Sequence, residues 1–366
     1  MKVLHIGQLV GGIEVYVRNT ILYSSSDFEF VIVEGQGDKH LPIIRNGVEI
    51  KTYRIPLYRD LNPLKDGKAL IQTIRIIREE KPGIIHCHSA KGGFIGRWAG
   101  FLTGIRVLYT PHAFSFLSTD SIIKKRIYVW LERLARLNSC LLACSESEQG
   151  LGRAMVHYRP SRALVWHNAV PDVVAGKLGC IDLGPFICCI GRPSYQKNTF
   201  FLLDVVKKVH ARYPELKFYL LGVGYYAPDA NELSLQIERA ELNGTFVMVP
   251  WLSHEETLRY VKASLMYLTV SRYEGLPLAV LEAMASGKAI IASDVTGNRD
   301  CVRDGENGYL LPMEVKSFTD AICLLIEDKN KRETMERNSR QLFEKEFLID
   351  HQIGLLETIY KDHAKE

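Results

Sequence analysis

The sequence predicts an α/β fold with two doubly wound parallel sheets, and three observations support this. Short apolar runs alternate with segments of helical periodicity, a pattern typical of a parallel sheet covered by helices on both faces. The alternation occurs twice and is interrupted between Pro171 and Pro185, where glycines and prolines gather. A chain of 366 residues is long enough for two domains of ordinary size.

The elements of the first half follow from these patterns in chain order. Apolar and β-branched runs predict strands, and apolar residues at helical spacing predict helices. The predicted strands span residues 2–6, 30–33, 50–54, 84–88, 106–110, 140–144 and 164–167. The predicted helices span residues 12–25, 65–80, 91–103, 121–137 and 145–154.

The second half repeats the alternation after the interruption. Its predicted strands span residues 186–190, 217–221, 245–249, 265–270, 289–293 and 308–311. Its predicted helices span residues 197–212, 230–242, 254–263, 277–286, 315–327, 330–344 and 346–363. We therefore place a first domain at residues 1–175, a second at 176–345 and a C-terminal helix at 346–366.

Composition excludes several classes of protein. With 47% hydrophobic and 24% charged residues, the chain is globular rather than disordered. Its eight cysteines form no C-x-x-C pair, which favours a reducing cytosol over a disulfide framework or a zinc site. No apolar run reaches the ~18 residues of a membrane span, and the N-terminus lacks the apolar stretch of a signal peptide. We expect a cytoplasmic protein, associated at most with the inner face of the cell membrane.

Charge is distributed unevenly along the chain. The first 180 residues carry 24 Lys and Arg against 15 Asp and Glu, whereas the remainder carries 22 against 27. Residues 121–137 combine five basic residues with a helical apolar stripe, formed by Ile123, Ile127, Trp130, Leu131 and Leu134. Such a helix could contact an anionic membrane. The alternative is an ordinary amphipathic helix whose stripe faces the core.

The most informative segment runs from Ser271 to Gly287, directly after a predicted strand. Pro277 suits the first turn of a helix, where a backbone N–H would have no intrahelical partner. Gly275 permits close approach of an anion to the backbone, and the helix start adds positive potential. Glu282 lies in an apolar helical run and needs a polar partner, such as a sugar or ribose hydroxyl.

This segment resembles the donor-site signature of the retaining GT-B glycosyltransferases of family four, E-G-x-P-x-x-x-x-E-A-M-A-x-G. The resemblance implies that Glu274 contacts the transferred sugar and that Glu282 binds the ribose of the nucleotide. It places Gly275, Leu276 and Pro277 in the loop that touches phosphate and sugar. It also implies two Rossmann-like domains that face a cleft, with the last helix crossing back to the first domain.

Further segments of the second half match at the family's spacings. Arg192 and Lys197 resemble the family's pair of cations that bind the diphosphate. Arginine supplies a planar donor fork and lysine a mobile point charge, which together neutralise a leaving diphosphate. Gly222 follows another strand, and Trp251 with Leu252 lies where the family holds the nucleotide base.

The first half carries weaker matches. Gly11 and Gly12 follow the first strand, where glycines permit approach of the donor phosphates. His112 lies in a loop where the family has a histidine close to the transferred sugar, although alanine follows it here instead of the usual glycine or aspartate. His88 and Ser89 belong to an H-x-H-S stretch that resembles the acceptor side of the family's cleft.

A metal site is not expected. His86 and His88 alternate on one predicted strand, but no third ligand is identifiable in the sequence. No D-x-D pair follows a strand either. The resemblance implies that Arg192 and Lys197, rather than a divalent cation, neutralise the diphosphate, and that no cofactor is required.

Together, these matches imply a retaining, metal-independent hexosyltransferase in which His112, Glu274, Arg192 and Lys197 act at the reaction centre. The expected donor is a nucleotide-diphosphate sugar, most often UDP in this family, held by the second domain. The expected acceptor is a glycan or a lipid-linked glycan of capsule, lipopolysaccharide or other surface polysaccharide, and no nucleic acid is involved. Two alternatives remain open: a nucleotide-sugar epimerase of the same fold, and a non-catalytic subunit that binds sugar nucleotides.

Overall fold

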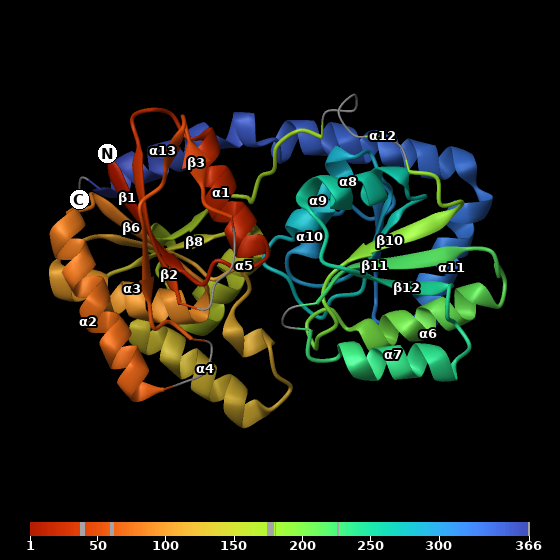
Figure 1. Cartoon of the computed structure of the whole chain (residues 1–366), viewed down its shortest axis with the longest axis horizontal. Helices are drawn as coiled ribbons and strands as arrows, with labels where there is room; N and C mark the ends of the chain where they lie inside the picture. Colours follow the sequence, from red (N-terminus) through yellow and green to blue (C-terminus); the bar gives the residue numbers. More distant parts are fainter. Residues whose placement is uncertain (37–40, 59–61, 174–178, 180, 225–226, 365–366) are drawn as a thin grey trace. The chain divides into compact units, whose positions relative to one another are not determined.

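The computed structural model describes residues 1–36, 41–58, 62–173, 179, 181–224 and 227–364, and Figure 1 shows its two units. The first unit combines Met1–Pro171 with Ile349–Glu366, and the second comprises Asp172–Leu348. The sequence analysis placed these boundaries after residues 175 and 345. The first of those predicted boundaries lies outside the described residues.

The first unit contains a seven-stranded sheet in the order β5-β2-β1-β6-β7-β8-β9, in which every neighbouring pair is parallel. Its strands are β1 (Lys2–Gly7), β2 (Glu29–Gly35), β5 (Thr52–Ile55), β6 (Ile84–His88), β7 (Val107–Thr110), β8 (Cys140–Ala143) and β9 (Ala163–Val165). A small antiparallel pair, β3 (Ile44–Arg45) and β4 (Val48–Glu49), was not predicted. Its turn is Asn46-Gly47, both with positive φ, which is a recognisable hairpin signal.

The helices of the first unit are α1 (Gly12–Tyr23), α2 (Pro63–Glu80), α3 (Ser89–Thr103), α4 (Ile122–Ala135), α5 (Glu146–Leu151) and α13 (Ile349–Ala364). A π-helical turn, Gly152–Val156, continues α5, and 3₁₀ turns span Ser115–Leu117 and Pro160–Arg162. The helix predicted at 145–154 is therefore shorter than expected.

The last helix packs on the first unit, as the fold prediction required. Helix α13 contacts α1 and β6. The buried Tyr360 lies with its hydroxyl 2.7 Å from Nδ1 of His86. The indole of Trp166 donates a hydrogen bond to the carbonyl of Gln352 at 3.0 Å. These contacts bring the two ends of the chain into one body, and Figure 1 shows both termini on this unit.

The second unit contains a six-stranded parallel sheet in the order β12-β11-β10-β13-β14-β15. Its strands are β10 (Phe186–Ile190), β11 (Lys217–Val223), β12 (Phe246–Pro250), β13 (Tyr267–Thr269), β14 (Ile290–Ser293) and β15 (Gly308–Leu311). Its helices are α6 (Thr199–His210), α7 (Ala230–Arg239), α8 (His254–Ala263), α9 (Leu278–Ala285), α10 (Asn298–Cys301), α11 (Val315–Glu327) and α12 (Lys329–Glu346). Of these elements only the four-residue α10 was not predicted. Two parallel sheets confirm the predicted fold class.

Helix α3 lies close to the first sheet because glycines form its inner face. An added Cβ at Gly93 would lie 2.2 Å from Cε2 of Tyr109, and one at Gly100 would lie 2.2 Å from Cγ2 of Val107. Neither position tolerates a larger side chain without displacement of the helix. This close packing also fixes the place of Arg97, which is buried on the same helix.

A buried ion pair joins α3 to α4. Arg97 donates to Glu132 with Nη2 and Oε2 2.9 Å apart, and its guanidinium stacks on the ring of Tyr109, 3.9 Å from the centroid. The Tyr109 hydroxyl donates to the other oxygen of Glu132 at 3.0 Å. The side chains of Arg97 and Glu132 are only 1% and 4% exposed, so each charge depends on the other for compensation. The face of α4 that carries Glu132 is therefore the buried face of the helix.

The loop after β7 has an unusual backbone. His112 and Ala113 both have positive φ, 52° and 78°, a region that disfavours residues with a Cβ. The buried Glu148 holds this loop, since its two oxygens accept the N–H groups of Ala113 at 2.7 Å and of Cys144 at 2.8 Å. The conformation of His112 is thus imposed by a carboxylate on α5.

We predict that Glu132→Ala destabilises the protein by about 3–5 kcal/mol, because it leaves the Arg97 charge buried and uncompensated. Urea unfolding of the variant would measure the loss. Lys125→Ala on the exposed face of the same helix is the control and should change stability by less than about 0.5 kcal/mol. Equal stability of both variants would contradict the ion-pair interpretation.

We predict that Ala113→Gly stabilises the protein by about 0.5–1 kcal/mol. Relief of the left-handed conformation outweighs the added freedom of the unfolded chain. The midpoint of thermal unfolding should rise. Ala321→Gly within α11 provides the contrast and should lower stability by about 1 kcal/mol. A loss of stability in Ala113→Gly would show that the loop is not strained.

Candidate active site

The predicted donor residues gather at one edge of the second sheet. In a parallel sheet every strand ends at the same edge, so the loops that follow the strands are neighbours. The relevant loops follow β10, β11, β12, β13 and β14. They carry the second-half residues that the sequence analysis selected, except Gly222, which lies within β11 rather than after it, and Glu282, which lies within α9.

Lys197 and Glu274 are in direct contact. The Lys197 ammonium lies 2.7 Å from Oε1 of Glu274, although the residues are 77 positions apart in the chain. The second oxygen of Glu274 accepts a hydrogen bond from Nε2 of Gln196 at 3.1 Å, and the same amide also reaches the carbonyl of Tyr273. Glu274 is 6% exposed, so these contacts compensate a buried carboxylate. Sequence reasoning did not select Gln196.

Glycines let these loops approach one another. The stem of Lys197 lies over Gly191, where an added Cβ would be 2.9 Å from Cγ of the lysine. Gly297 has φ 84°, and a Cβ there would lie 2.7 Å from the carbonyl oxygen of Gly275. The N–H of Glu274 donates to the carbonyl of Thr296 at 3.1 Å. The loop after β14 therefore supports the one that carries Glu274.

Helix α9 begins one residue later than expected. Pro277 has extended backbone angles and caps the helix, and Leu278 is its first residue. The buried Leu276 anchors the loop ahead of it. Glu282 is 8% exposed, and its Oε1 lies 2.7 Å from Nε2 of His254. His254 is the first residue of α8 and a second neighbour that sequence reasoning missed.

The remaining donor residues line the same edge. Burial and the Glu274 carboxylate raise the pKa of Tyr273 to about 12, while the positive charge of Arg192 acts in the opposite direction. Gly222 has φ 88° at a register shift in β11, and no atom of the described residues lies within 4 Å of where its Cβ would be. Trp251 is 60% exposed, so its ring is not a core side chain, and Leu252 beside it is half-buried.

The candidate residues of the first unit also follow strand ends. Gly11 caps α1 with φ 63°, and in the part of the chain that the structure describes no atom lies within 4 Å of the position of an added Cβ. Gly12 is exposed and begins the helix. Ser89 is half-buried at the start of α3, and its φ is 56°. These positions remain predictions for binding.

His88 does not present its side chain to an acceptor. It is fully buried, and its two ring nitrogens lie 2.9 Å from Nδ1 of His5 and 3.1 Å from Nε2 of His112. The predicted acceptor contact by His88 is therefore corrected to a supporting role beside His112. Burial lowers the pKa of His112 to about 3, which keeps the imidazole neutral at physiological pH.

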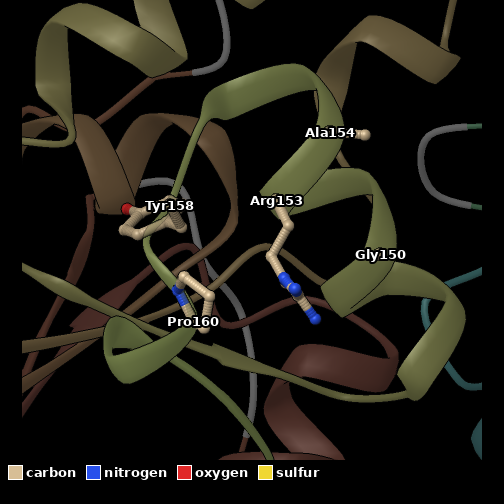
Figure 2. A pocket seen from close by; sticks show the side chains of 5 residues that line it. All are labelled: Gly150, Arg153, Ala154, Tyr158 and Pro160. Carbon is tan, nitrogen blue, oxygen red and sulfur yellow. The ribbon is translucent and has the colours of Figure 1, made fainter.

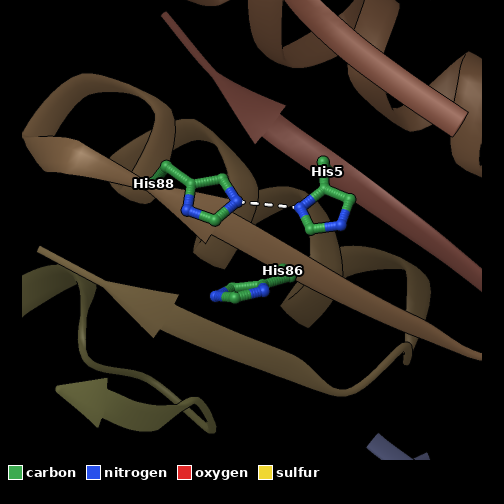
Figure 3. A group of neighbouring side chains, drawn as sticks. All are labelled: His5, His86 and His88. Carbon is green, nitrogen blue, oxygen red and sulfur yellow. Dashed lines mark hydrogen bonds between the residues drawn. The ribbon is translucent and has the colours of Figure 1, made fainter. Parts of the chain in front are cut away.

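The structure supplies the third histidine that the sequence did not reveal. His5 on β1 pairs in register with His86 on β6, and Figure 3 shows both rings with His88. One ring nitrogen from each of these three lies within 4.8 Å of the others. Sequence reasoning missed His5 because only the parallel pairing of β1 with β6 brings it there.

Two hollows lie away from these residues. One, of about 460 Å³, is lined by Gly150, Arg153, Ala154, Tyr158 and Pro160, which Figure 2 shows. Gly150 lies in α5, and the other four residues follow that helix and precede β9. The other lies along the first part of α2. Neither contains a predicted site residue.

Comparisons with known proteins agree with both units. A family model described as Glycosyltransferase Family 4 matches residues 10–173, and one described as Glycosyl transferases group 1 matches residues 177–342. A UDP-Gal:alpha-D-GlcNAc-diphosphoundecaprenol alpha-1,3-galactosyltransferase from Escherichia coli is 28% identical over 330 residues, which cover 86% of this chain and 84% of the relative.

Solved structures show the same fold. Sucrose-phosphate synthase from Thermosynechococcus elongatus superposes with a TM-score of 0.82 at 17% identity, covering 99% of this chain and 98% of the other. HepE from Anabaena, in complex with UDP and glucose, gives a TM-score of 0.76 at 18% identity, covering 98% and 99%. With a family model matched to each unit and the donor signature gathered at one sheet edge, the chain belongs to family 4 of the GT-B glycosyltransferases.

Proposed function

We propose that this glycosyltransferase moves a hexose-type sugar from UDP to a lipid-linked glycan acceptor, with retention of anomeric configuration and without a metal ion. The observation that carries the proposal is the contact between Lys197 and Glu274 at the start of α9. The relative from Escherichia coli, whose name specifies UDP-galactose and a diphosphoundecaprenol acceptor, supports the choice of donor and acceptor.

The leaving diphosphate is neutralised by two cations and a helix start. Lys197 carries a charge that Glu274 compensates while no donor is bound. A diphosphate competes for that ammonium and is further stabilised by Arg192 and by the positive end of α9. Charge that develops on the leaving group then meets fixed donors, and this lowers the barrier without a divalent cation.

Two glutamates each provide a carboxylate to the donor, Glu274 for the transferred sugar and Glu282 for the ribose. Glu274 keeps one oxygen on Gln196, which leaves the oxygen now shared with Lys197 for a sugar hydroxyl. Glu282 is aligned by His254 and can accept from ribose hydroxyls. The half-buried, neutral His112 supplies a contact on the first unit, where the acceptor is held.

We predict that Arg192→Ala and Lys197→Ala each lower kcat/KM about 10- to 150-fold, corresponding to about 1.5–3 kcal/mol for a hydrogen bond to a charged group. Mass spectrometry of UDP-sugar transfer to a polyprenyl-diphosphate acceptor would measure the effect. Lys217→Ala is the matched control, because Lys217 is exposed at the opposite end of β11.

Three results would contradict the proposal in different ways. Sugar transfer at the normal rate in both Arg192→Ala and Lys197→Ala would show that these two residues do not stabilise the leaving diphosphate. Loss of activity with EDTA and recovery with Mn²⁺ would show that a metal is required. Conversion of the sugar nucleotide without acceptor would favour the epimerase, and binding without any turnover would favour the non-catalytic subunit.

The first unit carries a surface suited to an anionic membrane. Helix α4 has its apolar stripe outward: Ile123 and Trp130 are 72% and 60% exposed. Its inner face carries Glu132, bound to Arg97. The stripe therefore does not face the core, which was the alternative left open by the sequence. Among the described residues, no helix has the length and apolar character of a membrane span.

Basic side chains accompany this stripe. Lys124, Lys125, Arg126 and Arg133 are exposed on the same helix. Apolar residues that enter the headgroup region, with cations beside them, are typical of helices that lie in the interface of an anionic bilayer. Attachment of this kind would bring the enzyme to a lipid-linked acceptor.

We predict that the protein cosediments with vesicles of phosphatidylcholine and phosphatidylglycerol, and not with phosphatidylcholine alone. The double variant Ile123→Ser, Trp130→Ser should bind at least roughly tenfold more weakly, because an apolar side chain contributes about 1.5–3 kcal/mol when fully buried. Leu355→Ser is the control, since this leucine on α13 is 57% exposed but lies outside the stripe. Equal binding by both variants would exclude α4 as the contact.

A further inference from the structure

Three imidazoles and a thiol form a continuous chain of hydrogen bonds inside the first unit. Nδ1 of His5 lies 2.9 Å from Nε2 of His88, a contact that Figure 3 marks with a dashed line. Nδ1 of His88 lies 3.1 Å from Nε2 of His112. Nδ1 of His112 in turn lies 3.5 Å from Sγ of Cys144. The proposed function uses only the His112 end.

These rings are neutral at physiological pH. Burial lowers the pKa of His5 and of His112 to about 3, and burial together with the neighbouring histidines holds the pKa of His88 well below its ordinary value. A neutral imidazole has one N–H and one acceptor nitrogen. In each contact between two rings, one must donate and the other accept. The three hydrogen-bonded rings therefore have only two consistent arrangements of their protons. Either Nδ1 carries the proton in all three rings, or Nε2 does.

The closed end of the chain distinguishes the two arrangements. Nε2 of His5 has no hydrogen-bond partner within the described part of the chain. A proton on Nε2 would leave an N–H group buried without an acceptor, which is rare and costs about 1–3 kcal/mol. With the proton on Nδ1, His5 donates to His88, His88 donates to His112, and His112 donates toward Cys144.

The other end, at Cys144, is consistent with this direction. Burial and the neighbouring carboxylate of Glu148 raise the pKa of the Cys144 thiol, so the sulfur keeps its hydrogen. A thiol sulfur is a weak acceptor. The Nδ1–H group of His112 thus ends the chain on its weakest partner, and a sugar hydroxyl oxygen would be a better one.

We propose that His5 is a positioning residue that fixes His112 in the Nδ1–H tautomer through His88, so that the ring donates to the transferred sugar or the acceptor. The role of His112 rests on the proposed function, whereas the direction of the chain does not. His5 touches no substrate in this scheme and acts only through the two rings that follow it.

A metal site is the competing interpretation of His5, His86 and His88. It requires a free lone pair on each ring. The hydroxyl of Thr110 donates to the carbonyl of Leu142 at 2.8 Å, so it accepts from Nε2–H of His86 at 2.8 Å. Nδ1 of His86 is then the acceptor for the hydroxyl of Tyr360 at 2.7 Å. Both nitrogens of His86 are occupied, which favours the relay.

Nitrogen-15 NMR of the histidine rings in the ligand-free full chain tests the direction of the relay. We expect Nδ1–H tautomers for His5, His88 and His112 at neutral pH in the unmodified protein. An Nε2–H tautomer at His112, or a rapidly exchanging mixture, would overturn the proposal whether or not any variant folds.

Two isosteric variants test the role of His5. His5→Asn places an amide N–H near the position that Nδ1 of His5 occupies. His5→Leu introduces a side chain of the same shape as asparagine but without an N–H group. We expect His112 to remain Nδ1–H in the first variant and to lose that preference in the second. The turnover of sugar transfer should fall on the order of tenfold in His5→Leu, recover in His5→Asn, and show little change in donor KM.

The outcomes separate the two hypotheses. If the unmodified enzyme transfers no sugar, the proposed function fails, and the ring tautomers still decide whether the relay exists. If His5→Leu leaves the His112 tautomer unchanged, the relay fails even when transfer is normal. If one equivalent of Zn²⁺ shifts the signals of His5, His86 and His88 together and raises the unfolding temperature, the cluster is a metal site and the relay is wrong.

Discussion

An ammonium and a carboxylate, Lys197 and Glu274, tie together two loops that are far apart in the chain, and the donor site that we propose depends on this contact. Glu274 is buried, so its charge needs the compensation that Lys197 provides. The pair holds the loop after β10 against the loop after β13. Gly191 and Gly297 make the approach possible because a Cβ at either position would collide with a neighbour. The site is thus assembled by charge compensation within steric limits that glycine sets.

The first unit uses neutral rather than charged groups for the same purpose. His5, His88 and His112 share protons along one line, and the buried Glu148 holds the backbone at the end of that line. Because one ring must donate and the other accept in each contact, the protonation of one ring depends on that of its neighbours. In the second unit, Lys197 can exchange Glu274 for an anion that binds. The hydrogen-bonded histidines of the first unit instead favour one arrangement of their protons. The two units therefore use different kinds of polar contact to hold their loops.

Helix α4 shows how a buried charge determines which face of a helix is exposed. Glu132 is held inside by Arg97 and Tyr109, so the apolar stripe that includes Trp130 must face outward. An isolated amphipathic pattern would normally turn that stripe inward. The network within the unit overrides this preference and leaves an apolar and basic surface on the unit that we assign to the acceptor.

The sequence predicted the two sheets, nearly all of their elements and the donor motif, because those signals lie in contiguous residues whose spacing reflects local backbone geometry. It could also indicate the cations at positions 192 and 197, through spacing that resembles a family. Only the tertiary structure placed His5 beside His86, aligned Glu274 with Gln196 and turned the stripe of α4 outward. Each of these depends on strand register or on a partner distant in the chain, and local periodicity carries no information about either.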